Sequence, residues 1–235
     1  MKKGDLRRGQ ILDAAEALFF EQGYDRTSIQ DILNRLGISK GGFYHYFDAK
    51  ETVLREICER HWTGQFDRLR MELYTGRRTA VDKLNLLLKQ ASLFETEEPH
   101  FAALMLKLCY RDRDAAIRDY RRRVLLDRLT DMAGDVMAEG VAQGTLHARH
   151  PAEVGRLLLL LAMDVDDEAC DLLAAETDNP DRMLRVIEIL NVYRESVETL
   201  SGAAYGTVVL FDAGALVGAW QQATEELNRL EGIEG

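Results

Sequence analysis

TSIQDILNRLGISKGGFYHYFDAK, residues 27–50, decides the fold, because it contains three helix starts and a tight turn. Thr27 followed by Gln30 fits the capping-box pattern that opens a helix. Gly37 supplies the left-handed residue that commonly ends one. Between them, apolar residues recur at the spacing of one helical face: Ile29, Ile32, Leu33 and Leu36. The sequence therefore predicts a short amphipathic helix here.

A second and a third helix start follow almost at once. Ser39 is a favoured N-cap, and Phe43 and Phe47 lie one turn apart on one side of the segment after it. Asp48 followed by Glu51 opens the next helix. Two short helices joined by a tight glycine-containing turn form the unit that places its second helix in a DNA major groove. The stretch therefore predicts a helix-turn-helix that binds DNA.

The pair Gly41 and Gly42 lies inside the second of these helices, where each glycine costs about 1 kcal/mol relative to alanine. One explanation is a backbone that approaches DNA more closely than a Cβ allows. The other is a tight crossing against the preceding helices. The flanking side chains carry donors suited to phosphate oxygens: Lys40, Tyr44, His45 and Lys50.

Residues 8–57 resemble the DNA-binding domain of the tetracycline-repressor (TetR) family of bacterial regulators. The resemblance rests on ILDAAEALFFEQGYDRTSIQDI, on the turn LGISKGGFYHYF and on DAKETVL, which follow the family pattern without a gap. It covers about the first quarter of the chain. Beyond it, the family implies an all-α body that joins two copies and holds a small molecule.

The resemblance also implies roles for individual residues. Ser39 to His45 would form the recognition helix, Lys50 would bind a phosphate, and Phe43 and Phe47 would belong to the core. Tyr44 and His45 occupy positions that commonly face DNA, although the chain has His45 then Tyr46 where members often carry Tyr then His. The implied DNA-binding set is Thr27, Ser28, Ser39, Lys40, Gly41, Gly42, Tyr44, His45 and Lys50.

Composition favours long helices. The chain has 235 residues, 46% of them hydrophobic, and only three prolines. We expect an all-α fold, with a DNA-binding domain over 1–50 and an effector-binding and dimerisation domain over 51–235. After the first domain, helices are predicted at 49–74, 79–95, 99–110, 113–143, 151–175, 181–201 and 208–231, and the 49–74 helix should pack on both domains.

Charge and cysteine content limit the function classes. The formal net charge is −10, of which residues 1–50 carry +1 and the remainder −11, so general affinity for nucleic acid is not expected. The three cysteines lack CxxC spacing, and the N-terminus lacks the features of a signal peptide, which favours the cytoplasm. The longest apolar run, 157–163, is too short to span a bilayer, so no membrane partner is expected.

An apolar stripe in the body has two interpretations. Its side chains could line a pocket for a partly hydrophobic effector, or they could be core. The predicted effector-binding residues are Trp62, Phe66, Phe101, Met105, Leu108 and Cys109, with Leu87 and Phe94 beside them.

Polar clusters in the body have simpler interpretations than a catalytic or metal site. The arginine-rich run 111–128 is predicted to be a solvated helix with pairs such as Asp114 with Arg118 and Asp119 with Arg123. The acidic face at Asp164, Asp167, Glu168 and Asp171 is predicted to be solvated or to meet Arg182 or Arg185 at a dimer rim. His147 and His150 lack a third ligand nearby, so no metal is expected. No cofactor or catalytic motif is found.

Dimerisation is expected through the helices at 151–175 and 181–201, which two copies could pair as a four-helix bundle. The predicted interface is Leu157, Leu161, Val165, Leu172, Val186, Leu190, Tyr193 and Val197. The sequence thus predicts a dimeric, ligand-responsive repressor that binds double-stranded palindromic operator DNA and leaves it when a small molecule binds. The alternatives are a ligand-independent helix-turn-helix regulator controlled by a protein partner, and an all-α enzyme.

Overall fold

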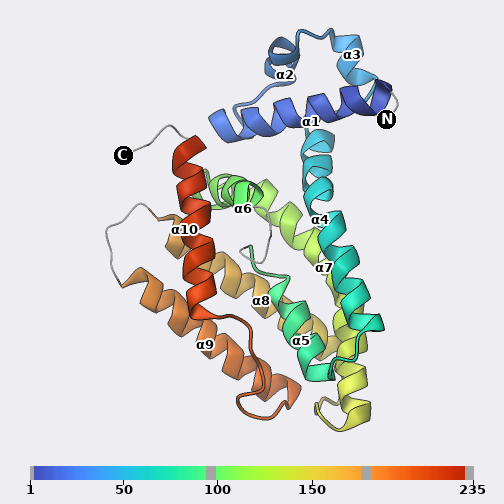
Figure 1. Ribbon diagram of the computed structural model, residues 1–235, viewed down its shortest axis with the longest axis vertical. Helices are drawn as coiled ribbons and strands as arrows, with labels where there is room; N and C mark the ends of the chain where they lie inside the picture. Colours follow the sequence, from blue (N-terminus) through green and yellow to red (C-terminus); the bar gives the residue numbers. More distant parts are fainter. Residues whose placement is uncertain (1–2, 94–98, 176–180, 231–235) are drawn as a thin grey trace.

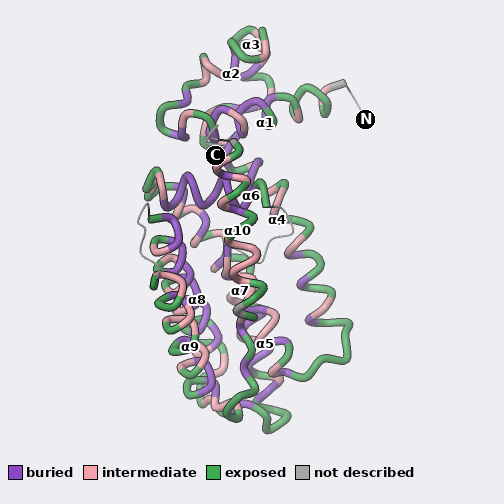
Figure 2. The backbone as a smooth tube through the Cα atoms, turned by 60° about the vertical axis from the view of Figure 1, so that its left-hand side comes forward, coloured by how far each residue is buried: buried purple, intermediate pink, exposed green. Residues whose placement is uncertain are grey.

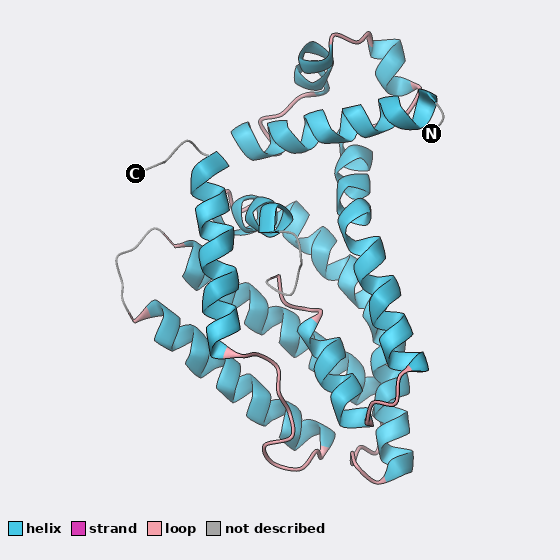
Figure 3. Cartoon of the chain, viewed as in Figure 1, coloured by secondary structure: helices cyan, strands magenta, loops and turns pink. Residues whose placement is uncertain are grey.

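The computed structural model describes residues 3–93, 99–175 and 181–230, and all regular structure within these ranges is helical (Figure 1, Figure 3). The all-α fold is confirmed. The elements are α1 (Lys3–Gln22), α2 (Ile29–Leu36), α3 (Lys40–Tyr44), α4 (Lys50–Thr75), α5 (Ala80–Lys89), α6 (Pro99–Leu106), the π-helical η1 (Lys107–Arg111), α7 (Ala115–Gln143), α8 (Pro151–Ala174), α9 (Arg182–Ser201) and α10 (Ala213–Leu230).

Helices α1, α2 and α3 form a small head at one end of the molecule, and α4 runs from this head into the body (Figure 1). The head is held together by side chains that are almost completely buried: Ile11, Phe19, Ile32, Phe43 and Phe47. The first turns of α4 contribute Val53 and Ile57 to the same continuous core, which then extends through the body (Figure 2). The shared helix predicted at 49–74 is therefore present.

The start of α2 differs from the prediction by one residue. Its N-cap is Ser28, whose side chain accepts from Asp31 N while Asp31 accepts from the Ser28 backbone. Thr27 is instead buried, and its hydroxyl donates to the carbonyl oxygen of Gly23 at 2.8 Å. A threonine that is held inward cannot cap the helix, so Thr27 with Gln30 is not the capping box.

In the body, α7 and α8 pack along each other and form the largest helix contact. Their close approach depends on Gly155 in α8, where a Cβ would lie 2.8 Å from the backbone carbonyl carbon and oxygen of Ala133 in α7. A Cβ atom essentially never lies this close to a backbone atom of another helix. The glycine at this position therefore sets the distance between the two helices.

Two predicted helices are shorter than expected. Helix α5 ends at Lys89 rather than at 95, and Phe94 lies outside the described residues. Helix α10 begins at Ala213 rather than at 208, because Asp212 accepts from the backbone N–H of Ala215 at 2.8 Å and so caps it. The extended segment before α10 is held on α5 by Asn85, whose side-chain amide bonds the backbone of Thr207 and Val209 at 3.1 Å each.

Candidate nucleic-acid interface and effector cavity

The recognition helix α3 turns its aromatic residues inward and its polar residues outward. Ser39 caps it by accepting from Gly42 N at 3.2 Å. Phe43 and Phe47 are buried with their ring centroids 5.8 Å apart, as the sequence predicts for core residues. This anchoring leaves the opposite side of α3 in solvent, where Tyr44 is 53% exposed. Lys40, Gly41 and His45 are exposed there too, as is Ser39 itself, and so is Ser28 at the start of α2.

The two glycines of α3 are not required by packing within the described chain. A Cβ at Gly41 would meet only the Ser39 hydroxyl, at 4.0 Å. At Gly42 it would meet that hydroxyl at 3.5 Å and the Cβ of Ile38 at 3.9 Å, which are ordinary contacts. The tight-crossing explanation is therefore wrong. Contacts between the described residues therefore do not account for the two glycines.

Two predicted DNA contacts have internal roles. Thr27 is buried and is not available to DNA, which corrects that prediction. Lys50 donates through Nζ to the carbonyl oxygens of Tyr24 at 2.7 Å and Thr27 at 2.9 Å, and its Nζ lies 4.0 Å from the centroid of the Tyr24 ring. It therefore ties the α1–α2 loop to the start of α4. An ammonium group has three donors, so one remains for a further acceptor.

A polar cluster joins the head to the body. Glu16 of α1 is buried, pairs with Arg60, and lies 3.2 Å from His61 Nε2 and 3.8 Å from His100 Nε2. His100 also reaches Glu226 of α10 through Nδ1 at 3.2 Å. Burial alone would raise the pKa of Glu16, but the hydrogen bond with His61 and the charges of His61, Arg60 and His100 outweigh it and lower this pKa. The residues come from α1, α4, α6 and α10, so no local sequence signal indicated the cluster.

The predicted effector residues are core residues rather than the walls of a sizeable cavity. Trp62, Phe66 and Phe101 border a cavity of only about 20 Å³, which is room for about one water. Met105, Leu108 and Cys109 are fully buried. Burial also raises the pKa of the Cys109 thiol to about 12. The apolar stripe therefore belongs to the core, which is the second of its two interpretations.

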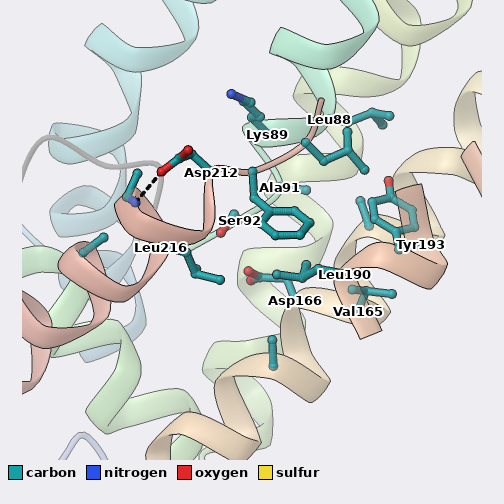
Figure 4. A pocket seen from close by; sticks show the side chains of 16 residues that line it. Leu88, Lys89, Ala91, Ser92, Val165, Asp166, Leu190, Tyr193, Asp212 and Leu216 are labelled. Carbon is teal, nitrogen blue, oxygen red and sulfur yellow. Dashed lines mark hydrogen bonds between the residues drawn. The ribbon is translucent and has the colours of Figure 1, made fainter. Parts of the chain in front are cut away.

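A larger cavity of about 220 Å³ lies between the end of α5, helices α8 and α9, and the start of α10 (Figure 4). Its lining is mainly apolar, with the carboxylate of Asp166 and the hydroxyl of Ser92 among the polar groups. Val165, Leu190 and Tyr193, which were predicted for the dimer interface, line this cavity instead. The extended segment that ends at Asp212 closes one side of it.

The predicted dimer interface is corrected further by burial inside one copy. Val186, Tyr193 and Val197 are buried, and the Tyr193 hydroxyl donates to the carbonyl oxygen of Leu158 at 3.0 Å. Leu161 and Leu172 are partly buried against the core of the same copy. The prediction failed because α8 and α9 carry apolar residues on more than one side, and the sequence does not say which of these sides faces inward. The exposed apolar residues of these helices are Leu157, Leu184, Val192 and Leu200.

The arginine-rich α7 and the acidic face of α8 pair with each other. Arg122 lies 2.7 Å from Asp164, and Arg118 lies 3.4 Å from Asp171. Arg121 is buried and lies 2.7 Å from Asp166. The prediction of a solvated α7 is thus wrong at the buried Arg121, because α7 and α8 pack side by side. Asp164 and Asp171 keep the predicted solvation in part, with side chains that are 65% and 49% exposed. The predicted pair of Asp119 with Arg123 is present at 3.3 Å. The predicted pair of Asp114 with Arg118 is wrong, because Asp114 caps α7 by accepting from the backbone N–H of Ala116 at 3.0 Å and Arg118 lies beside Asp171 instead.

Within the described ranges, no group of three or more histidine, cysteine, aspartate or glutamate side chains is arranged to hold a metal ion. The described helices include none that is long and apolar enough to cross a membrane.

The family model described as "Bacterial regulatory proteins, tetR family" matches residues 11–57. The chain is 26% identical over 182 residues to the fatty acid metabolism regulator protein of Bacillus subtilis, covering 74% of this chain and 92% of that protein. It is 28% identical over 144 residues to the HTH-type transcriptional repressor KstR2 of Mycobacterium tuberculosis, covering 59% of this chain and 68% of that protein.

Among solved structures, the regulator FadR of Bacillus subtilis in complex with stearoyl-CoA is similar, with a TM-score of 0.55 and 21% identity. The match covers 79% of this chain and 96% of that one. At this identity the likeness shows a shared fold. The fold extends beyond the head into the helical body.

Proposed function

We propose that this chain, which belongs to the TetR family of bacterial regulatory proteins, represses transcription by binding a palindromic operator as a homodimer and releases it when a small molecule fills the cavity beside α10. The DNA-binding unit is 1–50, and 51–235 is the effector-binding and dimerisation unit, with α4 shared between them. Operator DNA in a bacterium lies in the cytoplasm, so we place the protein there.

The observation that carries the proposal is the exposed side of α3. A Cβ at Gly41 or Gly42 would make only ordinary contacts with Ser39 and Ile38, and donors at Lys40, Tyr44 and His45 surround the two glycines in solvent. Backbone that is free to approach a phosphate or a base edge, with donors around it, is what major-groove binding by a short helix requires. Ser28 and Ser39 would contact the DNA backbone, and the third donor of Lys50 would reach a phosphate.

Two heads are needed for a palindromic site, with their recognition helices about 34 to 36 Å apart. We propose that α8 and α9 of two copies pair through their exposed apolar side chains, Leu157, Leu184, Val192 and Leu200. The Leu157 side chain is 43% exposed in the single chain, and a second copy would cover it.

The ligand would cause release of the operator through α10. This helix lines the cavity with Leu216 and, farther along, holds Glu226 beside His100, which in turn lies next to Glu16 of the head. A ligand that shifts α10 therefore acts on α1 as well as on the body. It can do so only if it binds the two arrangements with different affinities, and a coupling of about 1 to 3 kcal/mol is typical.

The test begins with selection of bound DNA from a random duplex pool, followed by fluorescence anisotropy on the selected site. Gly42→Leu should abolish binding while circular dichroism shows a folded protein. Gly64→Leu is the matched control, because Gly64 is exposed in the middle of α4, away from α3. Failure to enrich any sequence, or equal binding by the Gly42 variant, would contradict the proposal.

Dimerisation has its own test. Leu157→Glu should raise the dimer dissociation constant in sedimentation equilibrium, because two facing carboxylates would be buried at the interface. Met71→Glu, at a 62% exposed position on α4, is the control and should leave assembly unchanged. A parent protein that sediments as a monomer would reject the homodimer.

A further inference from the structure

The buried ion pair of Arg121 and Asp166 forms the wall between two cavities. Asp166 lines the cavity of about 220 Å³, and Arg121 lines the cavity of about 20 Å³ beneath α4. Their side chains are 8% and 3% exposed, and Arg121 Nη2 lies 2.7 Å from Asp166 Oδ2. Arg121 Nη2 also donates to the carbonyl oxygen of Ala91 at 2.6 Å. A molecule in the larger cavity therefore meets the carboxylate and not the guanidinium.

The carboxylate of Asp166 has one acceptor position left. Arg121 occupies one position, and the backbone N–H of Leu93 donates to its two oxygens at 3.2 and 3.3 Å. The side chain of Ser92 also bonds to it. A carboxylate has about four lone-pair sites, so these three partners leave about one for a donor from the cavity.

The charges around the cavity are already balanced. Arg121 neutralises Asp166 in the interior, and Lys89 and Asp212, the other charged residues of the lining, have opposite signs. A ligand cation would be a third buried charge without a counter-charge, and a ligand anion would also face the Asp166 carboxylate. Both are costly in a buried site. A neutral donor has neither cost.

We propose that the effector is a neutral, mainly apolar molecule with one hydrogen-bond donor, a hydroxyl or an amide N–H, which Asp166 accepts. This inference rests on the proposed function, since it names the ligand class of the same cavity. A cavity of about 150 Å³ holds benzene, so one of about 220 Å³ holds roughly nine non-hydrogen atoms. The apolar lining, which includes Val165, Leu190 and Leu216, would enclose the carbon chain (Figure 4).

The experiment compares four probes of nearly equal size by isothermal titration calorimetry on the full chain without DNA. Octan-1-ol has the required donor, and methyl heptyl ether has the same atoms without one. Octylammonium and octanoate carry the two charges. Octan-1-ol should bind roughly tenfold to a hundredfold more tightly than the ether, as expected for a hydrogen bond to a charged group, and the two ions should bind more weakly still.

Two variants locate the site. Ala219→Leu places a larger side chain in the cavity and should abolish octan-1-ol binding, whereas Ala138→Leu, at an exposed position of α7, should not change it. Asp166→Asn should reduce the preference for octan-1-ol over the ether, provided that circular dichroism shows the variant folded. If Asp166→Asn is not folded, Ala219→Leu alone shows whether octan-1-ol binds in this cavity.

Octanoate or octylammonium binding as tightly as octan-1-ol would overturn the inference. So would the absence of binding by all four probes, or binding that Ala219→Leu leaves unchanged. None of these outcomes touches operator binding, which the selected DNA tests separately. A chain that binds its operator but none of the probes would retain the regulatory function and lose the ligand class.

Discussion

Replacing Gly41 with alanine should separate the stability of the head from its ability to bind DNA. If α3 retains glycine for the sake of folding, the alanine variant should be less stable. If it retains glycine to let a partner approach, the variant should be more stable and bind DNA less well. The structure favours the second outcome, because a Cβ at Gly41 meets only the Ser39 hydroxyl, at 4.0 Å.

The magnitude follows from helix propensity without a steric correction. A glycine inside a helix costs about 0.5 to 1 kcal/mol relative to alanine. Gly41 lies in the first turn of a five-residue helix, so the lower end, about 0.5 kcal/mol, is appropriate. For a domain of this size, that corresponds to a rise of about 1 to 2 °C in the melting temperature. Loss of one close DNA contact should weaken operator binding roughly tenfold or more.

Urea unfolding followed by circular dichroism gives the first quantity, and fluorescence anisotropy on the selected operator gives the second. Gly64→Ala is the control, because its Cβ would meet only the flexible end of Arg68 at 3.5 Å. It should stabilise α4 and leave DNA binding unchanged. A Gly41 variant that is more stable and binds DNA as tightly as the parent would refute the assignment of this surface.

Three further changes test other parts of the structure. Gly155→Ala should destabilise the body by about 1 to 3 kcal/mol in urea unfolding, because its Cβ would lie 2.8 Å from the Ala133 backbone; a stabilised variant would mean that α7 and α8 lie farther apart. Lys50→Ala should lower the free energy of unfolding by about 1 to 3 kcal/mol, because its hydrogen bonds to the Tyr24 and Thr27 carbonyls are lost. It should also reduce the salt slope of operator binding by about one, and an unchanged slope would contradict the phosphate contact. Because the pKa of Glu16 is lowered below its usual 4.5, its carboxylate contributes stability that is present above that pH and lost as the pH falls through the lowered pKa. Glu16→Gln should therefore destabilise the protein at neutral pH and reduce the loss of stability below about pH 4.5. A variant with the same pH profile as the parent would contradict this.

The sequence determined the head almost completely, since its information is local. Caps, a left-handed glycine and the spacing of Phe43 and Phe47 act within a few residues of each other, so they specify α2, the turn and α3 directly. The error at Thr27 is of the same local kind. Thr27 and Ser28 are both good caps, and only the burial of Thr27 against Gly23 decides between them.

The body is different, because its helices are apolar on more than one side. Val165 and Tyr193 have the same sequence signature whether they face a second copy, the core or a cavity, and only the packing of α8 and α9 against α10 places them at the cavity. The sequence also showed the charges of Arg121 and Asp166, but it did not show that they form an ion pair, because the two residues are 45 positions apart on two different helices. Where each helix begins and ends is determined mainly by residues that are close together in the sequence. The cavity and the groups that face it are fixed by contacts between distant segments, and only the tertiary structure decides those.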